Sequence, residues 1–180
     1  HDNSAGLSAE KVKIAVIQFA PENIAETFIT PRDVSTFTDR LKTELGNVGV
    51  YEVIEREAME KILDEQEFDY LGCDSTDCAI EIGKIVGAGR IIVGKISNID
   101  QLHTVSAFMI DVQSGKILRQ HSEDCDCRFQ KFLRESIPQV ANALSVIKEP
   151  VLHEEKRFSW TATDPPSDSY EISISLMEDM

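Results

Sequence analysis

Residues 90–124 read RIIVGKISNIDQLHTVSAFMIDVQSGKILRQHSED, and this stretch decides the fold class. Its β-branched and apolar residues form three runs of strand length, over residues 90–99, 103–112 and 116–124. The segment Gln113–Lys116 (QSGK) is typical of a tight turn, so the last two runs are predicted to form a hairpin. Gly115 in this turn is expected to adopt a positive φ.

Upstream, residues 11–20 (KVKIAVIQFA) predict another strand, ended by Pro21. Apolar side chains at both parities in its centre are typical of a strand that is covered on both faces. A shorter strand is expected over residues 51–55. Apolar residues at helical spacing predict helices that begin near Asp33, Glu57, Cys78 and Phe129. Asp33 and Asp77 are predicted helix N-caps, and Pro138 is predicted to kink the last helix or to mark a restart.

The resulting order β-α-β-α-α-β-β-β-α predicts an α/β fold, with a single mixed sheet of about five strands packed by helices over residues 11–147. Residues 1–10 are expected to be a flexible N-terminus. Residues 148–180 are expected to be a C-terminal extension that forms a β-hairpin from residues 158–162 and 170–176. These C-terminal strands either pair with the domain's own sheet or add to a neighbouring molecule as a homo-oligomer.

The chain is strongly acidic, with a formal net charge of -14 and a pI of about 4.6. Such a surface repels phosphate backbones and anionic lipids, which argues against nucleic acid as a partner. The acid is concentrated between residues 52 and 69, where the carboxylates are Glu52, Glu55, Glu57, Glu60, Asp64, Glu65, Glu67 and Asp69. We interpret this block as the solvated face of a helix, or alternatively as a docking face for a basic partner.

No apolar run approaches the length of about 18 residues that a bilayer-spanning helix needs. The sequence begins at His1 without an initiator methionine or a signal-like apolar segment. We therefore expect that a targeting segment has been removed, and its absence does not argue for the cytoplasm.

The four cysteines lie in two close pairs, Cys73 with Cys78 and Cys125 with Cys127. Their even number favours disulfides in an oxidising compartment. A local bridge within the first pair is easy, whereas Cys125 and Cys127 in an extended segment would have Cα atoms about 6–7 Å apart. We therefore favour a bridge between the two pairs. The alternative is a thiol-based metal-binding or redox-responsive module, in which Cys73, Cys78, Cys125 and Cys127 hold zinc as four thiolates.

No catalytic motif is found, so neither catalytic residues nor a cofactor site is predicted. The glycines of residues 83–89 (GKIVGAG) follow a helix and precede a strand, the reverse of a phosphate-binding loop, and are read as a helix end. His103, His121 and His153 have no neighbouring nucleophile and are interpreted as surface histidines. An enzyme of unrecognised type remains a second alternative.

Four segments together carry a resemblance. Residues 13–20 (KIAVIQFA), 51–68 (YEVIEREAMEKILDEQEF), 78–96 (CAIEIGKIVGAGRIIVGKI) and 108–118 (FMIDVQSGKIL) resemble the CsgG-like superfamily. That superfamily includes the curli-export lipoprotein and penicillin-binding-protein activator lipoproteins. The fold is also similar to the N-terminal domain of TolB and to anticodon-binding domains. The resemblance covers residues 12–147.

The resemblance implies a bacterial, extracytoplasmic and often lipid-anchored protein that acts by assembly rather than by catalysis. It places the chain in the periplasm or at the outer membrane. The connections 98–103 and 113–116 are too short to span a bilayer, so a pore is not expected. The function expected from the sequence is that of a non-catalytic cell-envelope accessory domain that binds another protein through the acidic helix face, a sheet edge or the C-terminal extension.

Overall fold

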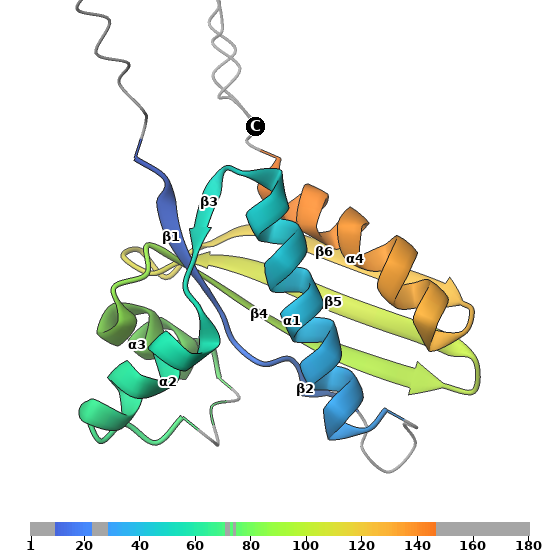
Figure 1. Cartoon of the computed structure of the whole chain (residues 1–180), viewed down its shortest axis with the longest axis horizontal. Coiled ribbons are helices and arrows are strands. Elements are labelled where there is room, and N and C mark those ends of the chain that lie inside the picture. The colour runs from blue at the N-terminus through green and yellow to red at the C-terminus, as the bar shows by residue number, and fades with distance from the viewer. Residues whose placement is uncertain (1–9, 23–28, 71–72, 74, 147–180) are drawn as a thin grey trace, which may run out of the picture. The chain divides into compact units, whose positions relative to one another are not determined.

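The computed structural model describes residues 10–22, 29–70, 73 and 75–146 (Figure 1). The elements in chain order are β1 (Val12–Val16), β2 (Ala20–Pro21), α1 (Pro31–Val48), β3 (Tyr51–Val53), α2 (Arg56–Glu65), α3 (Thr76–Val86), β4 (Arg90–Ile99), β5 (Leu102–Asp111), β6 (Ile117–Asp126) and α4 (Phe129–Ser145). The expected divisions at residues 1–10 and 148–180 stay predictions, because all of these residues but Glu10 lie outside the described part of the chain.

One mixed sheet of six strands organises the fold, with the order β3-β1-β4-β5-β6 and with β2 paired to β4. β1 is parallel to both β3 and β4, whereas β4, β5 and β6 are antiparallel neighbours. The predicted fold class is confirmed. The sixth strand arises because the predicted strand 11–20 is interrupted: the Phe19 N–H leaves the sheet and donates to Thr38 Oγ1 at 3.2 Å.

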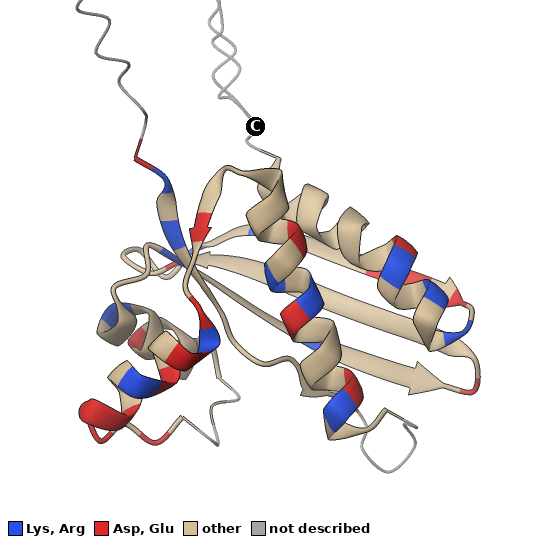
Figure 2. Ribbon diagram, viewed as in Figure 1, with Lys and Arg blue, Asp and Glu red and all other residues tan. Residues whose placement is uncertain are grey.

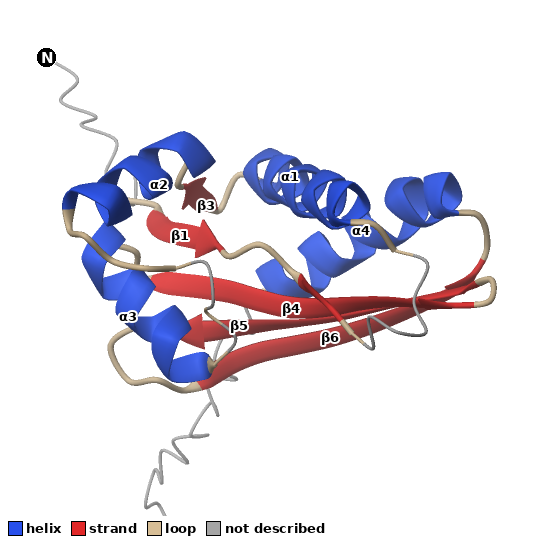
Figure 3. Cartoon of the chain, turned by 90° about the horizontal axis from the view of Figure 1, so that it is seen from below, coloured by secondary structure: helices blue, strands red, loops and turns tan. Residues whose placement is uncertain are grey.

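Each face of the sheet buries its own core, because alternate residues of a strand point to opposite faces. Ile14 and Val16 of β1 join the core under α1 and α4, whereas Ala15 joins the core under α2 and α3. Figure 3 shows α1 and α4 side by side along the sheet. The helices α2 and α3 cover the other face, over Ala15 of β1, Ile91 of β4 and Ile110 of β5. This confirms that residues 11–20 begin as a strand covered on both faces.

Two helix starts differ from the prediction. Thr30 rather than Asp33 is the N-cap of α1; its Oγ1 accepts from the Asp33 N–H at 3.2 Å, and the Asp33 carboxylate accepts from the Thr30 N–H at 2.9 Å. This reciprocal capping box needs the acid at the third helical position rather than at the cap. Ser75 rather than Asp77 caps α3.

Pro138 lies inside the continuous helix α4, so the predicted restart is wrong. Its neighbours Ile137 and Val140 are fully buried in the core under α1 and α4. Tertiary packing therefore holds the helix through a residue that removes one backbone hydrogen bond.

The predicted hairpin is confirmed, with β5 and β6 joined through residues 112–116. Gly115 has φ of +70°, and its N–H donates to the Asp111 carbonyl at 2.8 Å. The Asp111 carboxylate accepts from the Ser114 N–H, and this hydrogen bond lowers the pKa of Asp111.

Gly115→Val should destabilise the domain by about 1–2 kcal/mol, since a β-branched residue is strained at positive φ. Thermal unfolding followed by circular dichroism measures this as a lower melting temperature. The neighbouring variant Ser114→Ala, at negative φ, controls for loss of the turn's hydrogen bonds. A Gly115→Val melting temperature equal to that of the wild type would contradict the strain argument.

Candidate functional sites

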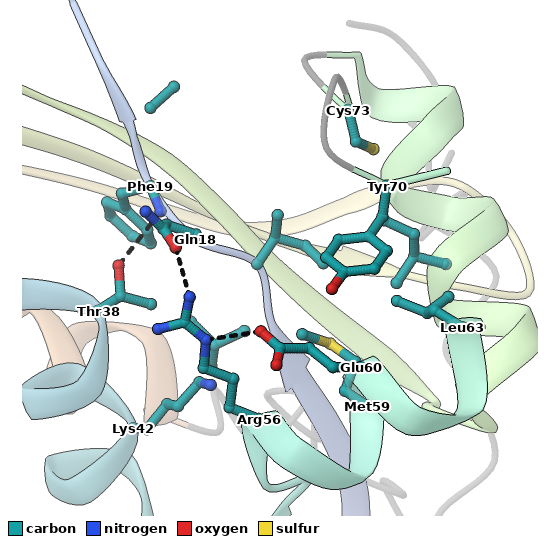
Figure 4. Close-up of a pocket in the computed structure, with 14 residues that line it drawn as sticks. Gln18, Phe19, Thr38, Lys42, Arg56, Met59, Glu60, Leu63, Tyr70 and Cys73 are labelled. Atoms are coloured by element: carbon teal, nitrogen blue, oxygen red, sulfur yellow. Dashed lines mark hydrogen bonds and ion pairs between the residues drawn. The ribbon is translucent and has the colours of Figure 1, made fainter. Parts of the chain in front are cut away.

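A pocket of about 500 Å³, here called the crossover pocket, opens between α1 and α2 (Figure 4). Its position follows from the topology. The chain leaves β1 for α1 on one face of the sheet, and leaves the adjacent parallel strand β3 for α2 on the other face. Connections that diverge in this way leave a crevice at the carboxyl ends of the two strands.

The floor of the crossover pocket is apolar and its mouth is polar. Four buried side chains, from the segment after β1 and from α2 and α3, form the floor: Phe19, Met59, Leu63 and Ile82. Gln18, Lys42, Arg56 and Glu60 stand at the mouth in Figure 4. An apolar pocket with a few convergent polar groups is the usual form of a small-molecule site.

Arg56 is held in place by partners on three elements. Its Nε donates to Glu60 at 2.9 Å, its Nη1 to Ser35 Oγ at 3.0 Å and its Nη2 to Gln18 Oε1 at 2.9 Å. The bond with Glu60 raises the pKa of Arg56. This guanidinium thus ties α2 to α1 and to the segment after β1, and its charge is balanced mainly by Glu60.

Lys42 differs from Arg56, because none of the ion pairs among the described residues involves its ammonium group. The side chain is half-buried on α1. Burial lowers the pKa of Lys42, a shift that Arg56 reinforces and that the carboxylates of Asp39, Glu55 and Glu57 oppose. Lys42 is therefore the cation of the crossover pocket whose charge is least compensated.

The cysteines form two local disulfides, Cys73–Cys78 and Cys125–Cys127. The favoured bridge between the two pairs is wrong. Cys73 and Cys78 pack against the core under α2 and α3, whereas Cys125 and Cys127 pack against the core on the opposite face of the sheet. The Cα atoms of Cys125 and Cys127 are 5.2 Å apart, closer than in an extended strand, because the strand ends at Asp126.

A four-thiolate zinc site requires the four sulfur atoms to lie close together. In the structure, the two pairs lie on opposite faces of the sheet. Within the described ranges, no group of three or more His, Cys, Asp or Glu side chains could hold a metal ion. Neither Cys125 nor Cys127 lines the crossover pocket, although Cys73 does.

One histidine was misread as a surface residue. His103 is 5% exposed, because the start of α4 covers it with Phe129 and Phe132, whose ring centroids lie 5.6 and 5.3 Å away. Its Nε2 lies 2.7 Å from Asn98 Nδ2. His121 is partly exposed and pairs with Glu123 at 2.9 Å. His153 lies outside the described residues.

The glycine-rich segment 83–89 ends α3, as predicted. Gly87 is the helix C-cap with φ of +73°, and its N–H donates to the Lys84 carbonyl at 3.3 Å. Gly83 has another role inside the helix, where a Cβ would lie 2.6 Å from Val112 Cγ2. Gly83 thus allows α3 to approach the segment after β5. The segment precedes β4 and presents no helix N-terminus to a phosphate.

The acidic block is largely the solvated helix face that the sequence predicts. Figure 2 shows in red the acidic residues on and beside α2. Most of these residues are exposed: Glu55, Glu57, Asp64, Glu65, Glu67 and Asp69. Glu60 is the exception, since it faces Arg56. The structure does not test the alternative reading as a docking face.

The outer edge of β6 is the second surface of interest, because no described strand pairs with it. The Cys127 N–H donates to the Gln101 carbonyl, so odd-numbered residues of this strand direct their backbone groups to β5. The backbone groups of Gln120, Ser122 and Asp124 therefore face outwards. Ile117 and Leu118 at the start of the strand are 54% and 41% exposed.

Three solved structures have a fold similar to that of this chain. The LpoB C-terminal domain from Escherichia coli matches with a TM-score of 0.54 and 16% identity, over 63% of this chain and 82% of that domain. Lipoprotein GNA1162 from Neisseria meningitidis matches with a TM-score of 0.51 and 14% identity, over 74% and 99%. TolB from Acinetobacter baumannii matches with a TM-score of 0.50 and 14% identity, over 75% of this chain and 27% of that protein.

These identities show a shared fold alone, and a comparison with curated proteins finds no match. No helix of the described part of the chain is long and apolar enough to cross a bilayer. The family evidence comes from the sequence: the family model described as "Curli production assembly/transport component CsgG" matches residues 3–108, more than half of the 180 residues. The chain therefore belongs to the CsgG family.

Proposed function

We propose that this chain is a non-catalytic accessory domain of the bacterial cell envelope that acts by binding another protein along the outer edge of β6. The family and the fold shared with envelope lipoproteins support an extracytoplasmic assembly role. The two disulfides are consistent with an oxidising compartment. None of the described histidines faces a nucleophile as a catalytic base would.

The single observation that carries the proposal is the ten-residue outer edge of β6. An unpaired edge is a template for another strand, and proteins usually shorten or cover such edges. Here Ile117 and Leu118 offer apolar anchors at one end, and Asp124 and Asp126 offer negative charge at the other. The partner strand should accordingly be apolar at one end and basic at the other.

A photoreactive benzophenone amino acid at Ser122 tests this surface in cells that produce the protein. Ser122 is exposed and lies in the middle of β6, so the probe should form a covalent product with a second protein. The matched control is the same probe at Arg40, which is exposed on α1. Equal products from both positions would contradict the proposal, as would a product formed only within the chain itself.

A further inference from the structure

We propose that the crossover pocket binds a small amphipathic monocarboxylate, with its carboxylate on Lys42 and its hydrocarbon part against the apolar side chains of Ile17, Met59 and Tyr70. This site is separate from the edge of β6 and does not depend on the proposed protein binding. Three features support this site: the position of the crevice, the ammonium group of Lys42 that has no ion-pair partner among the described residues, and the apolar side chains of the lining.

The location is a consequence of the fold rather than of loose packing. β1 lies between β3 and β4, and its connection and that of β3 run over opposite faces of the sheet. Ligands of open α/β sheets bind where connections part in this way. The volume of about 500 Å³ falls in the range of small-molecule sites, about 300–1,000 Å³.

The charge at the mouth favours one anionic group. Arg56 uses each of its three nitrogen atoms on protein partners, and Glu60 balances its charge. Lys42 is left as a half-buried ammonium without a carboxylate within 4.0 Å among the described residues. A bound carboxylate would supply that counter-ion, and a charge-assisted hydrogen bond in a partly desolvated site is a strong one. A dianion would bring a second negative charge close to the Glu60 carboxylate, which would repel it. The pocket therefore favours a monocarboxylate.

The floor favours a hydrocarbon body. Phe19, Leu63 and Ile82 are each at most 2% exposed and form an apolar base, over which Ile17 and Tyr70 are partly exposed to the pocket. Covering exposed apolar surface with a hydrocarbon group lowers the free energy by about 25 cal/mol per Å². The unbranched thioether of Met59 can also adapt to ligands of different shape. A medium-length alkyl or aryl carboxylate meets both requirements.

Three probes, each built on a chain of ten carbon atoms, test the site by calorimetry and by backbone NMR shifts on the full chain: decanoate, 1-decanol and decyltrimethylammonium. Decanoate should bind in a one-to-one ratio and shift the signals of α1, α2 and residues 16–20. The neutral and the cationic probe should bind at least ten times more weakly. The affinity for decanoate should fall as the pH is raised, because Lys42 loses its proton.

Lys42→Met keeps the length and apolar stem of the side chain and removes its charge. It should weaken decanoate binding at least tenfold while the melting temperature stays within a few degrees of the wild type. Lys84→Met removes a charge from exposed α3 and should leave binding unchanged. Equal binding of decanoate and decanol, unchanged affinity in Lys42→Met, or no saturable binding would each overturn the assignment.

Discussion

Replacing Phe37 with alanine is expected to lower the free energy of unfolding by about 3–5 kcal/mol. Phe37 is fully buried on α1, and its ring centroid lies 5.1 Å from that of Phe19 and 5.8 Å from that of Phe132. These rings join the segment after β1 to α1 and α4. The variant therefore leaves a cavity where three parts of the chain meet, and the residues around it are too tightly packed to close it.

Urea unfolding followed by far-UV circular dichroism measures this loss, with Thr36→Ala as the control. Thr36 is exposed on the adjacent position of α1, and its substitution should change stability by no more than about 0.5 kcal/mol. A domain has roughly 5–15 kcal/mol of stability in total, so Phe37→Ala should unfold at a much lower urea concentration. A loss below about 1 kcal/mol would show that the three rings are not a unit.

The hairpin and the core could be predicted because their signals are local. The turn residues around Gly115 and the alternating runs on either side determine β5 and β6 without reference to the rest of the chain. The spacing of Val34, Phe37 and Leu41 likewise predicts the buried face of α1, and all three are buried.

The prediction of disulfides is confirmed, but their pairing and the burial of His103 were predicted wrongly, because both depend on tertiary structure. Sequence spacing does not tell which face of a sheet a cysteine reaches, and it is this that keeps Cys73 away from Cys125. His103 lies in a strand whose neighbours alternate, but only the return of α4 over that end of the sheet buries it. The position of His103 within β5, where it pairs with Cys125 of β6, was the feature that could have indicated its burial.

The crossover pocket was missed for a related reason. Arg56 reads in the sequence as one of two cations in an acidic block, and Lys42 as an ordinary surface residue of a helix. Arg56 and Lys42 lie at the same pocket because β1 has a parallel neighbour on each side. The local periodicity of a sequence does not reveal the order of the strands. The rule that connections on opposite faces leave a crevice could have predicted the place only once that order was known.

Gly94→Val is expected to cost about 3 kcal/mol and to disturb the crossover pocket at the same time. A Cβ on Gly94 would collide with the ring of Phe19 and with the backbone carbonyl oxygen of Ser106. The carbonyl belongs to β5, which is paired with β4 over its whole length, so it cannot move without loss of the ladder. Phe19 is 2% exposed, so its ring can yield only by leaving its place in the core and entering the crossover pocket that it lines.

The matched control is Lys95→Val, one position along β4, where the side chain is exposed and valine suits a strand. It should change stability by no more than about 0.5 kcal/mol. Because Phe19 lines the crossover pocket, Gly94→Val should also weaken decanoate binding in buffer where the variant remains folded, whereas Lys95→Val should not. Wild-type stability in Gly94→Val would mean that the strand pair and the Phe19 ring can separate freely, which their burial argues against.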